Sequence, residues 1–278
     1  QRTLTRLGMT GKPIINVENA CSSSSSAFHQ AHMAVASGAY DVALVFGVDK
    51  LSQFGGGTIP LVDEDWEISQ GMLMPALYAM RACRYMHETG LTTEQLAGVS
   101  VKARAMGAHN PDAQFQKEIS LEEVMNARPI ADPFTLLHCC PTGDGAAAAV
   151  ICAGDVAHKF EAAPIKILAS DLCTGTYLTG YRDMTVPEIT VRGASEAYEE
   201  AGVGPEDIDV AEIHDAFTIA ELLYYEAFGF CGRGEAIRLL EDGVTSIGGA
   251  KPVNPSGGLL SKGHPVGATG IAQITEIT

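Results

Sequence analysis

Short runs of β-branched residues alternate with longer amphipathic stretches along this chain, and this alternation constrains its fold more than any other feature. Residues 14–17 have the pattern of a short strand, residues 21–37 that of a helix, and residues 41–48 that of a second strand. A strand, a helix and a second strand joined by short turns form the βαβ unit of a parallel or mixed sheet covered by helices. We therefore expect an α/β fold.

A helical and loop segment interrupts this pattern from residue 55 to about residue 135, with helices expected at residues 72–89 and 93–107 and a helix start at Ser120. Strands are expected again at residues 145–152, 165–169 and 210–213, and helices at 191–201, 216–228 and 267–278. The layout predicts two similar halves with mixed sheets layered by helices. The domains would be residues 1–54 with 136–160, the inserted segment 55–135, and residues 161–278.

Composition excludes several classes of protein. The chain of 278 residues is 46% hydrophobic and 19% charged, which is typical of a packed interior and not of a disordered chain. Its net charge is −16 and it has no basic run, so we expect no nucleic-acid and no membrane partner. The chain begins at Gln1 without Met and stops at Thr278 inside an expected helix. We therefore expect a fragment with incomplete termini.

Cysteine usage favours reduced thiols. The chain has seven cysteines, with no CxxC pair and no Cys/His spacing of the zinc type. This pattern argues against a disulfide framework and predicts no metal site. We therefore expect a cytoplasmic or organelle-matrix protein, and we assign it to the cytoplasm.

The first motif that could carry chemistry is Cys21 followed by five serines at residues 22–26. Cys21 is expected at the start of a helix, where unpaired N–H groups and the helix dipole favour a thiolate. The alternative is a buried structural cysteine beside a serine-rich helix start.

Two histidines stand in a second and a third motif. His214 is expected at the end of a strand, where ligands bind in open α/β sheets, and Asp215 follows it as a neighbour-orienting group or a simple helix N-cap. His264 lies between Gly263 and Pro265 in a glycine-rich loop before a helix. That loop lacks the spacing of known phosphate-binding motifs. A helix-start cysteine with two histidines suits covalent acyl transfer.

These three motifs, residues 19–27, 214–217 and 263–270, resemble those of thiolases in their order and spacing. The His-Asp-Ala-Phe version, with Asn-Pro-Ser-Gly-Gly at residues 254–258, resembles the branch of archaeal acetoacetyl-CoA thiolases and sterol-carrier-protein-type thiolases. The resemblance implies a thiolase fold in which segment 55–135 covers coenzyme A. Two departures stand out: the chain stops before the family's fourth catalytic motif, and Ala216 replaces a cysteine of the sterol-carrier type, so the second acid/base is unassigned.

The resemblance also implies roles for residues. Cys21 matches the nucleophile, His264 the base that activates it, and His214 a donor to an oxyanion hole, while the backbone N–H of Cys21 would serve a second hole. Ser256 and Gly257 would lie near the pantetheine channel. Because coenzyme A is an anion and the chain is acidic, local cations should meet its phosphates; the candidates are Lys102, Arg104 and Arg128.

We therefore expect an acyltransferase that acts on acetyl-CoA or 3-oxoacyl-CoA through an acyl-enzyme at Cys21. Coenzyme A or acyl-CoA would be the substrate, with no permanently bound cofactor, and the resemblance implies a homodimer or homotetramer. One alternative is a thiolase-like retro-aldol lyase that works on side-chain acyl-CoA with an OB-fold accessory protein. The other is a non-catalytic acyl-CoA-binding subunit.

Overall fold

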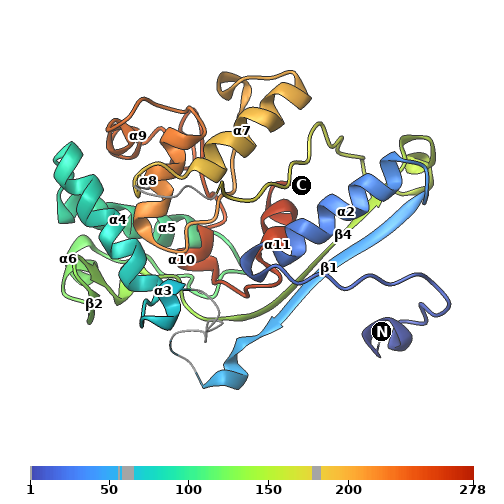
Figure 1. Cartoon of the computed structure of the whole chain (residues 1–278), viewed down its shortest axis with the longest axis horizontal. Helices are drawn as coiled ribbons and strands as arrows, with labels where there is room; N and C mark the ends of the chain where they lie inside the picture. The colour runs from blue at the N-terminus through green and yellow to red at the C-terminus, as the bar shows by residue number, and fades with distance from the viewer. Residues whose placement is uncertain (1, 56, 58–65, 177–182) are drawn as a thin grey trace.

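A computed structural model describes residues 2–55, 57 and 66–176 together with 183–278 (Figure 1). Of the expected inserted segment 55–135, Gly56 and residues 58–65 lie outside the described residues. The α-helices are α1 (Arg2–Arg6), α2 (Ser23–Ala36), α3 (Trp66–Ser69), α4 (Met74–Thr89), α5 (Thr93–Gly107), α6 (Leu121–Met125), α7 (Glu188–Ala201), α8 (Thr218–Ala227), α9 (Ala236–Glu241), α10 (Gly258–Lys262) and α11 (Thr269–Glu276). The strands are β1 (Val42–Lys50), β2 (Pro129–Ala131), β3 (Phe134–Thr135) and β4 (Asp144–Cys152). Short 3-10 turns are η1 (Ala20–Ser22), η2 (Leu51–Phe54), η3 (Leu136–His138), η4 (Gly154–Lys159) and η5 (Pro205–Asp207).

The strands β1 and β4 form a long antiparallel ribbon. Val42 lies opposite Cys152 and Lys50 opposite Asp144. Helices α2 and α11 run along this ribbon (Figure 1). Val45 and Ile151 of the ribbon pack with Val35 and Ile271 of the two helices, because alternate side chains of a strand point to the same face.

One glycine fixes how closely the chain after His264 approaches β1. A Cβ on Gly47 would lie 2.3 Å from the carbonyl oxygen of Gly267 and 2.7 Å from the Cα of Ala268. No other residue fits this contact between two backbones. The ribbon thereby holds the loop that precedes α11.

A second core lies among α4, α5, α8 and α10. Its largest fully buried side chains include Tyr85, Leu96, Phe134 and Leu222. Helix α5 begins with a reciprocal cap, in which the side chain of Thr92 accepts from the backbone of Gln95 while the Gln95 side chain accepts from the backbone of Thr92. None of the described helices combines the length and the apolar character needed to cross a bilayer.

Most of the expected elements are confirmed, but three strand predictions are wrong. Residues 14–17 and 165–169 are irregular, and residues 210–213 contribute only an isolated bridge between Ala211 and Val253. A strand exists through its ladder with a neighbour, and no described strand lies beside the first two segments. Ile15 accordingly has 73% of its surface exposed.

The expected parallel βαβ unit is also wrong within the described residues. β1 pairs in antiparallel fashion with β4, which is distant in sequence, instead of with a strand before α2. Local periodicity predicts that a segment is extended, but the partner is chosen by packing far along the chain. The division of the chain into two halves and an inserted segment stays a prediction.

Candidate active site

The three predicted motifs meet at one point. The Sγ atom of Cys21 lies 3.2 Å from Nε2 of His264, across 243 residues of sequence. The rings of His214 and His264 stand edge to face, with centroids 4.9 Å apart. One donor atom from each of the three side chains lies within 4.8 Å of the others. The structure therefore brings together the three residues that the sequence proposed as catalytic.

Cys21 is held in the tight turn η1, immediately before α2. Ala20 adopts a positive φ of 45°, which is uncommon for a residue with a side chain. The serines that follow support this turn: Ser23 accepts from the backbone N–H of Asn19 at 2.8 Å, and Ser26 accepts from its side-chain amide at 2.9 Å. Ser24 accepts from the backbone of Ile271 in α11 at 3.1 Å. The serine run thus anchors the nucleophile's turn to its neighbours.

The tautomer of His264 follows from its partners. Nδ1 of His264 lies 2.7 Å from Oγ1 of Thr269, and that hydroxyl donates to the carbonyl of Pro265 at 3.1 Å. Because the hydroxyl proton is already used, Oγ1 accepts a hydrogen bond from Nδ1–H. Nε2 is then the unprotonated nitrogen, and it faces the thiol of Cys21 as a base should.

An aspartate that the sequence analysis did not select fixes the His264 loop. Oδ2 of Asp49, in β1, accepts from the backbone N–H of Gly267 at 2.5 Å. Its charge also raises the pKa of Cys21. A carboxylate near the end of an expected strand was the only signal for it in the sequence.

The protonation states differ from the helix-dipole expectation. Burial raises the pKa of the Cys21 thiol above its ordinary value, Asp49 raises it further, and a backbone hydrogen bond opposes them only in part. Burial, and then the neighbouring His214, lower the pKa of His264 to about 3. The expectation of a preformed thiolate is therefore wrong, because desolvation outweighs the helix start. At neutral pH the pair consists of a thiol and a neutral imidazole.

His214 is placed by its neighbours in the chain. The backbone N–H of Ile213 donates to Oδ1 of Asn254 at 2.7 Å, so the end of this segment is fixed to the loop before α10. Burial lowers the pKa of His214, which keeps the ring neutral. Its Nε2 atom is buried and has no hydrogen-bond partner among the described residues. An unsatisfied buried nitrogen beside a nucleophile suits a contact with a reacting group.

Asp215 does not cap the helix that follows it. Its Oδ1 accepts from the backbone N–H of Leu259 at 2.7 Å, at the start of α10. The residue is fully buried, and burial together with Glu221 raises its pKa. The alternative of a simple N-cap for α8 is therefore wrong; Asp215 ties the His214 segment to the glycine-rich loop.

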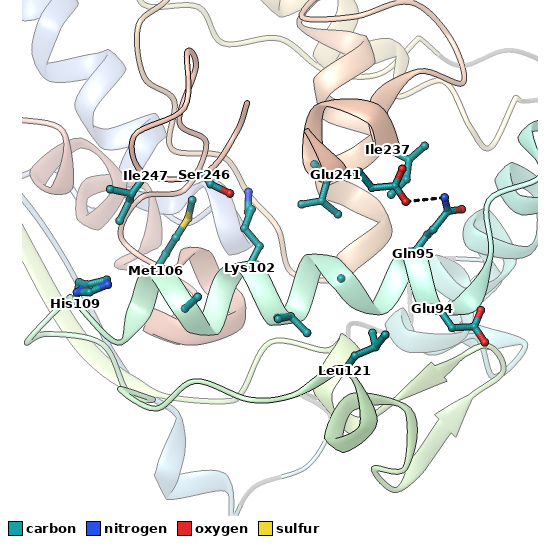
Figure 2. Close-up of a pocket in the computed structure, with 14 residues that line it drawn as sticks. Glu94, Gln95, Lys102, Met106, His109, Leu121, Ile237, Glu241, Ser246 and Ile247 are labelled. Carbon is teal, nitrogen blue, oxygen red and sulfur yellow. Dashed lines mark hydrogen bonds between the residues drawn. The ribbon is translucent and has the colours of Figure 1, made fainter. Parts of the chain in front are cut away.

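Lys102 does not present a cation to a ligand. Its Nζ atom is paired with the carboxylate of Glu221 and donates to the hydroxyl of Tyr225 at 2.9 Å and to the carbonyl of Val253 at 3.0 Å. Its assignment to a coenzyme A phosphate is wrong because all three ammonium protons are used inside the protein. Lys102 also lines a cavity of about 660 Å³ between α5 and α9, where Gln95 donates to Glu241 (Figure 2).

Arg104 is also turned inward, whereas Arg128 is exposed. The guanidinium of Arg104 lies 3.9 Å from the ring centroid of Phe115, only 9% of the residue is exposed, and burial lowers its pKa. It packs on an aromatic face, and its assignment to a coenzyme A phosphate stays a prediction. Arg128, just before β2, keeps an exposed side chain, and its role stays a prediction.

Ser256 and Gly257 are held by contacts with Glu212 and α5. The backbone N–H and the hydroxyl of Ser256 donate to the two oxygens of Glu212 at 3.0 and 2.8 Å. Gly257 has a φ of +97°, and a Cβ there would lie 2.6 Å from the Cα of Gly107 in α5. Both residues make contacts inside the protein, and their place near the pantetheine channel stays a prediction.

The groove beside the catalytic histidine is lined by other residues. A cavity of about 710 Å³ has among its lining residues Gln114, Thr142, Gly143, Lys262 and Gly263. Thr142 forms a parallel bridge with His264, so this groove ends next to the base. The run of small residues with Pro141 and Asp144 at residues 140–147 was the signal in the sequence that could have selected Thr142 and Gly143.

Cys21, His214 and His264 are also residue types that bind zinc. They form a group of donors close enough for one ion among the described residues. The same geometry serves proton transfer, since the base faces the thiol directly. The expectation of no metal stays a prediction.

Comparisons with known proteins identify the family of this chain. Family profiles match residues 2–155 as "Thiolase, N-terminal domain" and residues 170–278 as "Thiolase C-terminal domain-like". Benzoylsuccinyl-CoA thiolase subunit BbsB of Thauera aromatica is 47% identical over 278 residues, which cover 99% of this chain and 72% of that protein. An acetyl-CoA acetyltransferase of Methanothermobacter thermautotrophicus is 44% identical over 274 residues, covering 97% and 72%.

Solved structures also match this chain over nearly its whole length. The Ltp2-ChsH2(DUF35) aldolase matches with a TM-score of 0.84 and 30% identity, covering 98% of this chain and 74% of that chain. The dimeric peroxisomal thiolase of Saccharomyces cerevisiae shares the fold, with a TM-score of 0.66, 20% identity, and coverage of 99% and 72%. The chain belongs to the thiolase family and has its α/β fold.

Proposed function

We propose that this chain is a thiolase-type acyltransferase in which Cys21 carries the acyl group of acetyl-CoA or 3-oxoacyl-CoA. The observation that carries the proposal is the 3.2 Å contact between the thiol of Cys21 and the unprotonated Nε2 of His264. A neutral thiol gains nucleophilicity when a base accepts its proton during attack. Similarity to proteins named acetyl-CoA acetyltransferase supports the same substrate class.

In the proposed reaction, Sγ of Cys21 attacks the carbonyl carbon while His264 takes the thiol proton. With acetyl-CoA, collapse of the tetrahedral intermediate breaks the thioester carbon–sulfur bond, and the proton on His264 passes to the leaving coenzyme A thiolate. With a 3-oxoacyl-CoA, Sγ attacks the 3-keto carbon, collapse breaks the bond between C2 and C3, and the leaving acetyl-CoA enolate takes up a proton at C2. His214, in its Nε2–H form, donates to the oxyanion, and its present lack of a partner leaves that nitrogen available. Attack by coenzyme A, or by the carbanion of acetyl-CoA, then transfers the acyl group from Cys21.

The groove that ends beside His264 is the proposed path of the coenzyme A arm. It has a volume of about 710 Å³ and is bordered by Gly143 and Gly263, where small residues leave room near the backbone. In this proposal coenzyme A acts as a substrate and no cofactor is permanently bound.

The proposal extends to partners and compartment. A homodimer or homotetramer follows the similarity to a dimeric thiolase, and the word "subunit" in the name of BbsB and the DUF35 component of the aldolase support an accessory protein. Seven free cysteines support a reducing compartment such as the cytoplasm.

A retro-aldol lyase acting on side-chain acyl-CoA is the second candidate, because the aldolase structure matches this chain with a TM-score of 0.84. The two activities differ in their need for a nucleophile. A thiolase forms a covalent acyl-cysteine, whereas a retro-aldol cleavage needs no acyl-enzyme.

The test replaces Cys21 with alanine in the full-length protein and follows thiolytic cleavage of acetoacetyl-CoA. We expect loss of turnover by about 10⁴-fold or more, and an acetyl adduct on the Cys21 peptide of the wild type after incubation with acetyl-CoA. Cys83→Ala is the control, since that thiol is exposed on α4. Unchanged turnover in Cys21→Ala, or an adduct spread equally over several cysteines, would contradict the assignment of Cys21 as the nucleophile. Either result would favour the lyase or a non-catalytic subunit.

A further inference from the structure

The catalytic cluster, Cys21 with His214 and His264, is also a set of ligands for a soft metal ion. One donor atom from each of the three side chains lies within 4.8 Å of the other two. The chain has seven cysteines, eight histidines and 34 acidic residues, yet among the described residues only these three form such a group. Thiolate sulfur and imidazole nitrogen suit zinc, whereas magnesium and calcium prefer oxygen ligands. The composition of the group therefore suits Zn²⁺.

The spacing of the donor atoms is close to that of zinc ligands. Zinc binds cysteine sulfur at about 2.3 Å and histidine nitrogen at about 2.0–2.1 Å, so two ligand atoms of a tetrahedral site stand about 3.5 Å apart. Sγ of Cys21 and Nε2 of His264 are separated by 3.2 Å. These two atoms need to part only slightly to accept an ion between them, and the His214 donor needs only a side-chain shift to complete the set.

Both histidines have a nitrogen that is free for a metal. Nδ1–H of His264 donates to Oγ1 of Thr269 at 2.7 Å, which leaves the lone pair of Nε2 directed at Cys21. Metal-bound histidines typically have their other ring nitrogen fixed in this way. Nε2 of His214 has no hydrogen-bond partner among the described residues. Because a neutral imidazole exchanges its proton between its two nitrogens, His214 can donate to an oxyanion in one form and bind a cation in the other.

The surroundings of the sulfur favour a cation. Cys21 and His214 each keep part of their surface exposed, so the cluster is not sealed from solvent. The carboxylate of Asp49 is near enough to raise the pKa of the Cys21 thiol, and its Oδ2 accepts from the backbone N–H of Gly267 at 2.5 Å. A negative charge at this distance attracts a cation, and the net charge of −16 adds to that attraction.

We propose that Cys21, His214 and His264 bind one Zn²⁺ ion reversibly, and that the bound ion inhibits the acyl-transfer reaction. The zinc–sulfur bond forms as the S–H bond of Cys21 breaks, and the proton passes to solvent. Each histidine binds through a nitrogen lone pair, and water fills the fourth position. The sulfur can then no longer attack a carbonyl. The inhibition rests on the proposed function, whereas the binding of the ion does not, and the ion is a competitor of the substrate instead of a resident cofactor.

The binding test titrates Zn²⁺ alone into the reduced full-length protein in competition with a chromophoric chelator. We expect one ion per chain, and we expect Cys21→Ala and His214→Ala each to weaken zinc binding by about 100-fold or more, because each removes one of three ligands. Cys83→Ala is the matched control, since that thiol is exposed on α4 and its loss should leave the affinity unchanged. Mg²⁺ should not compete. Equal zinc affinity of the wild type and Cys21→Ala would overturn the proposal, since the ion would then lie elsewhere.

Two further measurements locate the ion without requiring turnover. Co²⁺ bound in the same site should show the charge-transfer absorption of a thiolate ligand, and this absorption should disappear in Cys21→Ala. Zinc should slow alkylation of the Cys21 peptide by iodoacetamide about tenfold or more, and a chelator should restore the rate, while the Cys83 peptide should react as before. Bound zinc that leaves the alkylation of Cys21 unchanged would contradict the proposal. Thermal unfolding of each variant without metal separates the loss of a ligand from misfolding.

Inhibition is measured as thiolytic cleavage of acetoacetyl-CoA at a free Zn²⁺ concentration fixed by a metal buffer, because the thiol of coenzyme A also binds the ion. We expect turnover to fall as the site fills and to return when a chelator is added. Zinc that binds at Cys21 without slowing turnover would overturn the inhibition. If Cys21→Ala retains turnover while the wild type binds zinc at this residue, the proposed function fails and the zinc site is supported.

Discussion

Two buried polar clusters in this protein contrast in how completely their groups are paired. The ion cluster, Lys102 with Glu221 and Tyr225, joins α5 to α8 deep in the larger core. The ammonium of Lys102 has three acceptors and the hydroxyl of Tyr225 contacts Thr245 at 3.0 Å as well, while Oε2 of Glu221 has no partner among the described residues. The catalytic cluster, Cys21 with His214 and His264, carries no such set of partners.

The catalytic cluster keeps nitrogen atoms free for chemistry. Nε2 of His264 has only the sulfur of Cys21 at 3.2 Å, and Nε2 of His214 has no partner among the described residues. Hydrogen-bonded groups stabilise the folded chain. Groups left unpaired do not contribute that stability, but they remain able to bind a reacting oxygen or proton. The contrast shows that burial alone does not mark a candidate catalytic residue; this cluster stands apart because its unpaired nitrogen atoms lie close to a thiol.

The largest expected effect tests the catalytic side of this contrast. Replacing His264 with alanine removes the base from the thiol, and we expect turnover of acetoacetyl-CoA to fall by about 10³–10⁴-fold. The free energy of unfolding should change little by comparison, because the ring's one strong partner is the hydroxyl of Thr269. Steady-state kinetics and urea unfolding of the same sample check both parts. A variant with a much lower free energy of unfolding but unchanged turnover would contradict this contrast.

The next effect tests the ion cluster. Lys102→Met leaves the carboxylate of Glu221 buried without its cation, so we expect a loss of about 3–5 kcal/mol in the free energy of unfolding. Denaturant titration measures it. Adding Glu221→Gln to the same chain removes the unpaired charge and should recover part of the loss. A variant of unchanged stability with impaired coenzyme A binding would instead return Lys102 to the ligand-binding role that its contacts now exclude.

A smaller effect is expected at His214. His214→Ala should lower turnover by about 10²–10³-fold, which is the usual cost of one oxyanion donor. His214→Asn retains an N–H donor and should recover much of the rate. The comparison of kcat for the two variants separates a donor role from packing, since asparagine would fill the ring's space poorly.

The smallest change is a pH dependence. Because burial raises the pKa of Cys21, the thiolate population at neutral pH is low, and deprotonation increases as the pH rises toward that value. We expect alkylation of the Cys21 peptide by iodoacetamide to accelerate about tenfold per pH unit between about pH 7 and 9. Mass spectrometry of the peptide follows the rate. An alkylation rate that stops rising near neutral pH would show that the thiolate is already formed, as the position of Cys21 at a helix start predicted.

Several features were predictable because they are encoded locally. The helix over 93–107 was predicted with the bounds it has, since its cap residues and its apolar spacing lie in the segment itself. The three catalytic candidates were also identified from the sequence, because each stands in a motif whose residues are contiguous. Strands were predicted less well: residues 165–169 have β-branched character but no neighbour with which to form a ladder.

The assignment of Lys102 to a coenzyme A phosphate failed for a related reason. Charge is visible in the sequence, but whether a charge meets solvent or a buried partner is not. Lys102 finds Glu221, which is 119 residues away, and Arg104 finds the face of Phe115.

By itself, then, the sequence determined the family, the α/β class and the identities of Cys21, His214 and His264, since contiguous motifs carry that information. The tertiary structure decided which atoms face each other and how strongly water is excluded. It set the tautomer of His264 through Thr269, and through burial it kept the thiol and both imidazoles neutral. Desolvation and long-range pairing depend on the sum of contacts from many distant segments, and no local pattern encodes that sum.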